Sequence, residues 1–234
     1  TDAELGLLTG ANLTLATAGN ITVNAVTAGG TDTISGTTLL SATGSGNVSF
    51  STGASTFTNA LVVQGTAINL DRSVTTVGSD LTFKSALNVD GSVTVDSGNG
   101  GAAATAGNVT FEGIVSANDG TGDALTVTAN GGTTDGDVDF QAAVDGTNDL
   151  VSLTVSAATQ VDLTNVTTTG AIAVTGTNID LNTAAIASDD GDVTFTGVVD
   201  LEGGAASVNS DQNNDGTDGN ILITGTVEGG QTLS

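Results

Sequence analysis

The sequence predicts an all-β protein: a β-solenoid of parallel stacked strands, forming a single domain over residues 1–234. Three observations support this fold. A five-residue motif recurs at a nearly constant interval, short segments alternate apolar with polar residues, and no segment shows sustained helical spacing of apolar residues. Equivalent short strands at a fixed interval of 20–50 residues are typical of solenoids, in which each repeat packs on its neighbours.

The recurring motif is a glycine, then Asn or Asp, then an apolar, a polar and an apolar residue. Seven copies, one with Ser79 in place of the glycine, occupy residues 19–23, 46–50, 79–83, 107–111, 136–140, 191–195 and 219–223. Neighbouring copies are almost evenly spaced, except that the interval between the fifth and the sixth is nearly twice the usual length. We therefore expect about 28 residues per coil, roughly eight coils, and a degenerate copy at residues 161–163 or 171–174.

A second series of strand-like segments lies about half a period away from the motif. Its members are residues 91–95, 124–127, 152–155 and 178–181. Alternating, β-branched segments of this length are typical of strands with one buried face. Stacked at about 4.8 Å per coil, they would build a rod roughly 40 Å long.

The phenylalanines suggest how the coils are aligned. Five of the six occupy the third strand position of the motif, so we expect one internal column of Phe50, Phe83, Phe111, Phe140 and Phe195. The polar residue between the two apolar ones should face outward, at Thr22, Ser49, Thr82, Thr110, Asp139 and Thr194. An antiparallel β-sandwich is the alternative fold, but sandwich strands do not normally repeat a motif at a constant period.

The composition excludes several classes of function. Acidic residues number 26 and basic ones 2 (Arg72 and Lys84), which gives a formal charge of −24 and leaves no basic surface for nucleic acid or anionic lipid. Without Cys or His there are no disulfides, no thiolate chemistry and no usual zinc site. No apolar run is long enough for a membrane-spanning helix.

High charge and many small polar residues also raise the possibility of disorder. The regular pattern of Val, Ile and Leu argues against it. The first residues carry neither a start Met nor a basic segment followed by an apolar one, which predicts a processed chain or an excerpt of a longer one.

Residues 136–140 through 152–158, and residues 177–181 running into 191–197, resemble the repeats of filamentous-haemagglutinin-like giant bacterial surface proteins. These are adhesins exported by two-partner secretion or as autotransporters. The resemblance extends from about Gly10 to Gly225. It implies a right-handed parallel β-helix, export to the cell surface, and service as a stalk or fibre.

The best candidate for a binding site is an acidic segment near the C-terminal end. Oxygen-bearing side chains at relative positions 1, 3 and 5, followed by Gly216 at position 6, match the opening of an EF-hand calcium loop. Position 12 is Leu222 where that loop needs a bidentate Glu, so Asp218 is the candidate replacement. The candidate Ca²⁺ ligands are Asp211, Asn213, Asp215, Thr217 and Asp218. An ordinary polar turn is the alternative interpretation.

Weaker acidic clusters at residues 118–123, 145–149 and 189–192 are interpreted as solvated turns. Because a charge of −24 on a small rod repels itself, divalent cations or high salt are expected to stabilise the fold.

We expect no enzymatic activity. Paired carboxylates are the minimum for glycoside hydrolysis, and polysaccharide-active β-helices are a known class. Trp, Tyr and His are nevertheless missing, and these usually supply stacking and acid–base groups. Ice binding through ordered Thr arrays is a second minor alternative, since Thr-x-Thr occurs only sporadically, at residues 56–58, 126–128 and 194–196.

The expected role is an extracellular, secreted or cell-surface structural and adhesive solenoid. The alternative is a self-assembling subunit of a filament or surface layer, joined head-to-tail and stabilised by calcium. Neither end of the sequence resembles a capping helix, and uncapped coils would expose strand edges to a second copy.

Overall fold

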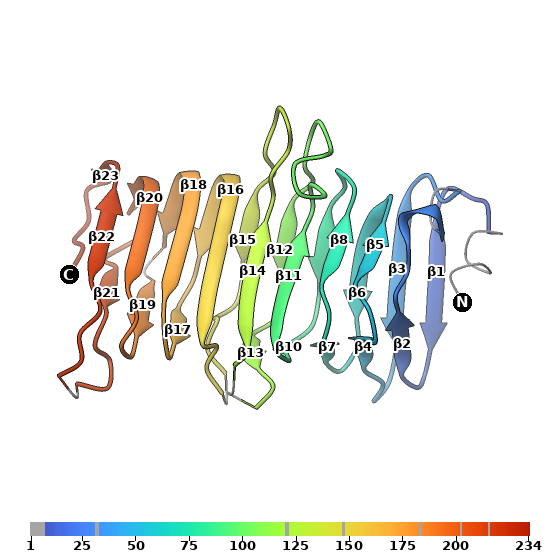
Figure 1. Cartoon of the computed structure of the whole chain (residues 1–234), viewed down its shortest axis with the longest axis horizontal. Helices are drawn as coiled ribbons and strands as arrows, with labels where there is room; N and C mark the ends of the chain where they lie inside the picture. The colour runs from blue at the N-terminus through green and yellow to red at the C-terminus, as the bar shows by residue number, and fades with distance from the viewer. Residues whose placement is uncertain are drawn as a thin grey trace.

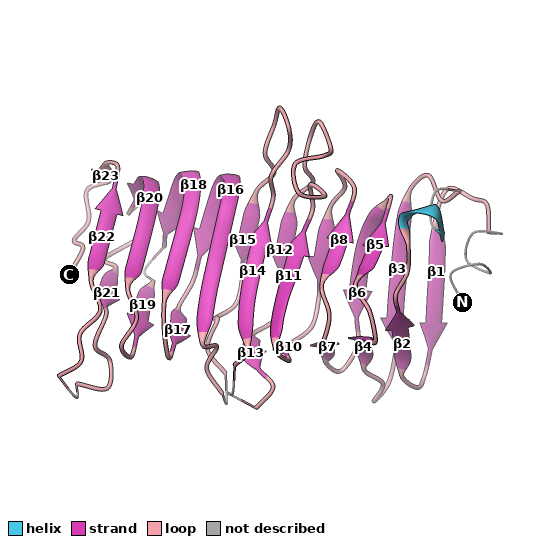
Figure 2. Cartoon of the chain, in the orientation of Figure 1, coloured by secondary structure: helices cyan, strands magenta, loops and turns pink. Residues whose placement is uncertain are grey.

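The computed structural model describes residues 8–30, 33–119, 122–146, 148–182, 184–201, 203–214 and 216–234. Within these ranges the chain forms strands β1 to β23 and one short 3₁₀ turn, η1 (Ala28–Gly30), which confirms the all-β prediction. Figures 1 and 2 show the strands stacked side by side along the long axis, with β1 at one end and β22 at the other. In the described part of the chain, no helix has the length and apolarity needed to cross a membrane.

The strands stack in three columns, and every pairing between named strands is parallel. The first column contains β5 (Ser55–Phe57), β8 (Val74–Thr76), β11 (Ser92–Asp96), β14 (Ala124–Thr128), the first parts of β16 (Ser152–Leu163), β18 (Ile172–Leu181) and β20 (Val193–Asp200), and β22 (Ile221–Thr224).

The other two columns follow the same order along the chain. The second column contains β1 (Leu13–Thr17), β3 (Thr37–Ala42), β6 (Ala60–Gln64), β9 (Leu81–Phe83), β12 (Val109–Phe111), β15 (Val138–Phe140), the last parts of β16, β18 and β20, and β23 (Val227–Glu228). The third column contains β2 (Ile21–Asn24), β4 (Val48–Ser51), β7 (Ile68–Leu70), β10 (Leu87–Val89), β13 (Val115–Ala117), β17 (Val166–Thr168), β19 (Ala185–Ser188) and β21 (Ser207–Asn209). Single bridges through Val144 link β13 to β17.

The chain visits the three columns in turn, as in β8, β9, β10 and then β11, β12, β13. Long parallel sheets of this kind are consistent with a solenoid. The step along the sequence between paired strands is not constant, however. Leu61 pairs with Leu81, and Leu81 pairs in turn with Val109, so the second step is clearly longer than the first. Extra residues lie in loops such as 97–108 and 129–137, which project from the upper edge in Figure 1.

The glycine of the motif is explained by close backbone contact between successive repeats. A Cβ atom on Gly136 would lie 2.0 Å from the carbonyl oxygen of Gly107, and one on Gly219 would lie 2.2 Å from that of Gly191. Neither distance leaves room for a side chain, so the motif requires glycine where one repeat crosses the preceding one.

The Asn or Asp of the motif joins one repeat to the next. Its side-chain oxygen accepts the backbone N–H of the equivalent residue in the following repeat: Asp80 from Asn108 at 2.9 Å, and Asn108 in turn from Asp137 at 2.9 Å. Because amide and carboxylate oxygens both accept such a bond, Asn and Asp are interchangeable in this role.

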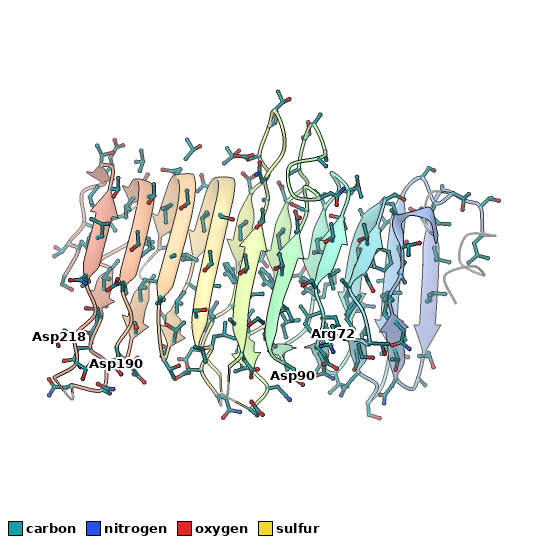
Figure 3. The ribbon with its side chains drawn as sticks, viewed as in Figure 1. Arg72, Asp90, Asp190 and Asp218 are labelled. Atoms are coloured by element: carbon teal, nitrogen blue, oxygen red, sulfur yellow. The ribbon has the colours of Figure 1, made fainter. Side chains whose placement is uncertain are left out.

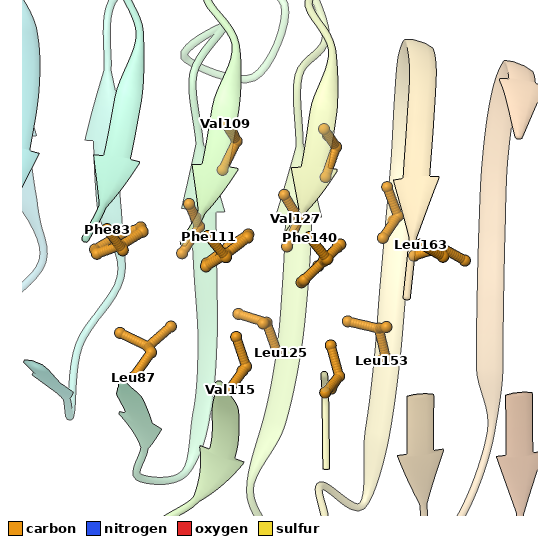
Figure 4. Packing of buried hydrophobic residues seen from close by; sticks show 14 of the residues in the cluster. Phe83, Leu87, Val109, Phe111, Val115, Leu125, Val127, Phe140, Leu153 and Leu163 are labelled. Carbon is orange, nitrogen blue, oxygen red and sulfur yellow. The ribbon is translucent and has the colours of Figure 1, made fainter. Parts of the chain in front are cut away.

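The prediction of a single five-membered phenylalanine column is wrong. Phe83, Phe111 and Phe140 do stack in the second column, with ring centroids 5.3 Å and 4.6 Å apart (Figure 4). Phe50 instead lies in the third column and Phe195 in the first. Strands in all three columns have apolar side chains that face the core, so the same motif can form a strand in any of them.

The uncertainty about the degenerate copy has a structural cause. Both candidates form strand: Val161 pairs with Val138 in the second column, and Ile172 pairs with Val193 in the first. This is possible because β16 and β18 each run through both columns as one strand, with a register shift between Val155 and Ala158. The second series forms a column as predicted for Val93, Leu125 and Leu153. Its expected fourth member, Ile179, lies in the second column instead.

One continuous hydrophobic cluster fills the space between the columns, and its buried members extend from Val23 to Ala206. Short strands in all three columns alternate buried and partly exposed residues, and all six Phe side chains are fully buried. Burying such a side chain contributes about 1.5–3 kcal/mol. The core therefore continues along nearly the whole stack.

Candidate functional site

The loop predicted to bind calcium lies between β21 and β22, at the lower edge of the molecule. Two hydrogen bonds close its base: Ser210 Oγ donates to the Gly219 carbonyl at 2.8 Å, and the Gly219 N–H donates to the Ser210 carbonyl at 3.1 Å. Figure 3 labels Asp218 in this loop and Asp190 in the neighbouring turn at the same end of the molecule. The loop is thus a compact excursion from the stack.

The structure places the described candidate ligands in different surroundings. One carboxylate oxygen of Asp211 is buried without a hydrogen-bond partner, while Asn213 Nδ2 donates to Asp190 Oδ1 at 3.3 Å. Thr217 and Asp218 are exposed, and each takes part in a noncovalent interaction. Asp215 lies outside the described residues. Within the described ranges, no three acidic side chains converge as metal ligands, so calcium binding stays a prediction.

Asp192, in the adjacent turn, is committed to the fold. It accepts both the backbone N–H of Asn220 at 2.7 Å and the side-chain amide of Asn220 at 3.0 Å. These two bonds stabilise the charged form and hold the pKa of Asp192 below its ordinary value. The carboxylate joins two repeats, as the motif requires.

The cluster at residues 118–123 is interpreted from the sequence as a solvated turn, but Asp123 is not solvated. Asp123 is buried and accepts backbone N–H groups from Gly91 at 2.6 Å, Asn118 at 3.1 Å and Asp119 at 3.3 Å. A buried carboxylate with three such donors stabilises the backbone around it. In the cluster at 145–149, burial and then the charges of Asp145 and Asp189 raise the pKa of Asp149.

A feature that the sequence analysis missed is a row of acidic side chains on the outer face of the second column. Five consecutive register positions carry carboxylates, which we call the carboxylate ladder: Asp139, Asp162, Asp180, Asp200 and Glu228. Neighbouring strands are about 4.8 Å apart, so each carboxylate faces another of the same charge.

Amide side chains supply the hydrogen bonds within this ladder. Gln160 Nε2 donates to Asp162 Oδ1 at 3.0 Å and to Asp180 Oδ2 at 2.5 Å. Asn178 Nδ2 donates to Asp180 Oδ1 at 2.9 Å, and Gln141 Nε2 donates to Asp139 Oδ2 at 2.7 Å. Partial burial, and then repulsion from Asp162, raise the pKa of Asp180 from 3.8 to about 6.

The two basic residues of the chain are engaged elsewhere. Lys84 Nζ lies 2.5 Å from Glu112 Oε1, and Arg72 Nη1 donates to the Asp71 carbonyl at 2.5 Å. Lys84 also lines a shallow polar hollow of about 320 Å³ together with Ser41, Gln64 and Ser85.

A pattern of Asp at the centre of an apolar–Asp–apolar triplet could have revealed the ladder. It occurs at residues 138–140, 161–163, 179–181 and 199–201. The intervals between these triplets are unequal and all shorter than the expected repeat, so a search at constant period does not align them.

Comparison with protein families, with curated proteins and with solved structures finds no match in any of the three. No relative therefore assigns a role to the acidic loop or to the carboxylate ladder.

Proposed function

We propose that the chain is an extracellular structural and adhesive β-solenoid, a right-handed parallel β-helix that serves as the stalk or fibre of a secreted or cell-surface protein. The observation that supports this best is the stack of parallel strands, continuous in the first and second columns, over one continuous core. Ten strands in the second column correspond to a length of about 45 Å at 4.8 Å per strand.

The outer faces also favour a structural role. They carry rows of short polar side chains that bond from one repeat to the next, as Asn69 does with Ser49 and Asn88. Such rows stabilise the stack and are repeated along it. The likeness of the repeats to filamentous-haemagglutinin-like proteins supports the same proposal. The proposal assigns no catalytic site to the chain.

A second candidate is a self-assembling filament or surface-layer subunit, joined head-to-tail and stabilised by calcium. Apolar side chains are exposed at both ends of the described stack: Leu15 is 39% exposed on β1, and Ile221 and Val227 are 48% and 47% exposed on β22 and β23. These strands also have an edge that is not paired within the described residues. A second copy stacked there would cover apolar surface and extend the columns.

Electron microscopy of the purified chain, with Ca²⁺ and again with EDTA, tests both candidates. Single short rods under both conditions are expected for a stalk segment. Long fibres of uniform width would favour the self-assembling subunit, and their loss in EDTA would assign calcium a structural role. Globular particles without a long axis would contradict both.

A further inference from the structure

We propose that the carboxylate ladder is a pH-responsive element that stabilises the β15–β23 part of the stack when the surroundings become mildly acidic. The inference goes beyond the proposed function and does not depend on it. It rests on the register of the strands and on the groups that face Asp180.

Asp180 lies at the centre of the ladder. On one side β16 presents Asp162, on the other β20 presents Asp200, and both are in direct register with it. Asp139 on β15 and Glu228 on β23 extend the row beyond these neighbours. Like charges directly opposite one another on a sheet are destabilising.

Neither basic side chain of the protein offsets this repulsion. Lys84 is paired with Glu112, and Arg72 bonds the Asp71 carbonyl, so both are engaged away from the ladder. The only described donors to the Asp180 carboxylate are the neutral amides of Gln160 and Asn178. A proton on Asp180 removes one charge and creates a donor that can bond Asp162.

The direction of the effect follows from the pKa of Asp180, which the fold raises from 3.8 to about 6. Because the folded chain binds this proton more tightly than the unfolded chain, stability rises as the pH falls through about 6. The gain in stability is complete near pH 3.8, the ordinary pKa of Asp, because the unfolded chain also takes up the proton there.

Thermal unfolding of the wild type, Asp180→Asn and Asp80→Asn, from about pH 7.5 to about pH 4.5 at constant ionic strength, tests the proposal. Asp80→Asn is a matched control, because it also removes one charge and Asn108 performs the same bonding role in the next repeat. The wild type is expected to melt about 2–4 °C higher at the lower pH. Asp180→Asn should melt higher than the wild type at the higher pH and gain less on acidification, while Asp80→Asn should follow the wild type.

Three results would overturn the proposal. The first is a wild-type melting temperature that does not rise on acidification. The second is a rise in Asp180→Asn as large as that in the wild type. The third is a rise in Asp80→Asn that is reduced as much as the rise in Asp180→Asn. The last would mean that relief of overall charge, and not the ladder, is responsible. If Asp180→Asn does not fold, NMR titration of the Asp180 carboxyl carbon in the wild type decides: a midpoint near 6 supports the proposal, and one near 3.8 overturns it.

Discussion

Two rows of outward-facing side chains, one on the third column and one on the second, form their hydrogen bonds in different ways. On the third column, an amide ladder consists of Ser49, Asn69, Asn88 and Ser116 in direct register. Its members bond in sequence: Asn69 Nδ2 to Ser49 Oγ at 3.1 Å, Asn88 Nδ2 to Asn69 Oδ1 at 3.0 Å, and Ser116 Oγ to Asn88 Oδ1 at 3.2 Å. Each neutral group donates to the preceding one, so the row is satisfied without charge.

The carboxylate ladder has an acceptor at every position, and its donors come from residues outside the row: Gln141, Gln160, Asn178 and Thr226. Its bonding therefore depends on protonation, whereas that of the amide ladder does not. Residues 33–70, which include Ser49 and Asn69 of the amide ladder, contain no charged residue. The amide ladder itself therefore has no group that titrates, whereas the carboxylate ladder responds to pH. The Asp71–Asp90 pair that follows β7 and β10 is separate from the amide ladder, and burial and then the charge of Asp90 raise the pKa of Asp71.

The largest effect should come from the core that both ladders share. Phe111→Ala removes the middle ring of the Phe83–Phe111–Phe140 stack and should lower the free energy of unfolding by about 3–5 kcal/mol. Phe57→Ala is the control, since Phe57 is equally buried but pairs with Thr76 and has no ring partner. Urea unfolding should show a larger loss for Phe111→Ala, by about 0.5–1.5 kcal/mol. Equal losses would mean that ring stacking adds nothing.

A smaller loss of stability should follow from disrupting the close backbone contact between Gly136 and Gly107, just before β15. Gly136→Ala would place a Cβ 2.0 Å from the Gly107 carbonyl oxygen and should cost about 1–3 kcal/mol, because the two repeats must move apart. Gly29→Ala, where a Cβ would meet nothing within 4 Å, should leave the melting temperature almost unchanged. Similar melting temperatures for the two variants would contradict this account of the motif.

Breaking the amide ladder should cost less again and should not depend on pH. Asn69→Ala removes the link between Ser49 and Asn88, and we expect a loss of about 1 kcal/mol. The loss should be the same at about pH 7.5 and about pH 5.5, because none of the groups titrates there. A pH-dependent loss in urea titrations would remove the distinction between the two ladders.

The smallest effect on stability is expected at Asp192, where the dependence on pH should be opposite in direction to that at Asp180. Bonds from Asn220 lower the pKa of Asp192, so Asp192 contributes stability above its ordinary pKa of 3.8, and this is lost as the pH falls further. Asp192→Ala should therefore be slightly less stable than the wild type at neutral pH, and the difference should vanish in acid. Asp192→Asn, which keeps an acceptor, is the control. A difference that grows in acid would show that the sign is wrong.

Much of the fold could be predicted from the sequence. Gly136 marks a repeat because glycine is required where Gly107 lies against it, and Asn108 marks one because its side-chain oxygen accepts the backbone N–H of Asp137 in the following repeat. Such requirements act on single positions, so they are visible as a motif. The alternation of Val138, Asp139 and Phe140 likewise reports which side chains face inward.

The assignment of copies to columns could not be predicted, because the motif is the same in all three. Phe50 and Phe111 occupy equivalent motif positions, yet they lie in the third and second columns. Loops of different length, such as 97–108, change the interval without changing the motif. The carboxylate ladder was missed for that reason: Asp162 and Asp180 are recognised as neighbours only once the shorter repeat between them is known.

Hydrogen exchange followed by mass spectrometry at about pH 7.5 and about pH 5.5, corrected for the intrinsic pH dependence of exchange, compares the two ladders directly. Protection in β16, β18 and β20 should increase at the lower pH, while protection in β3, β4 and β6, which lie within the uncharged residues 33–70, should change much less. Equal gains in both regions, or a loss of protection around Asp180, would contradict this account.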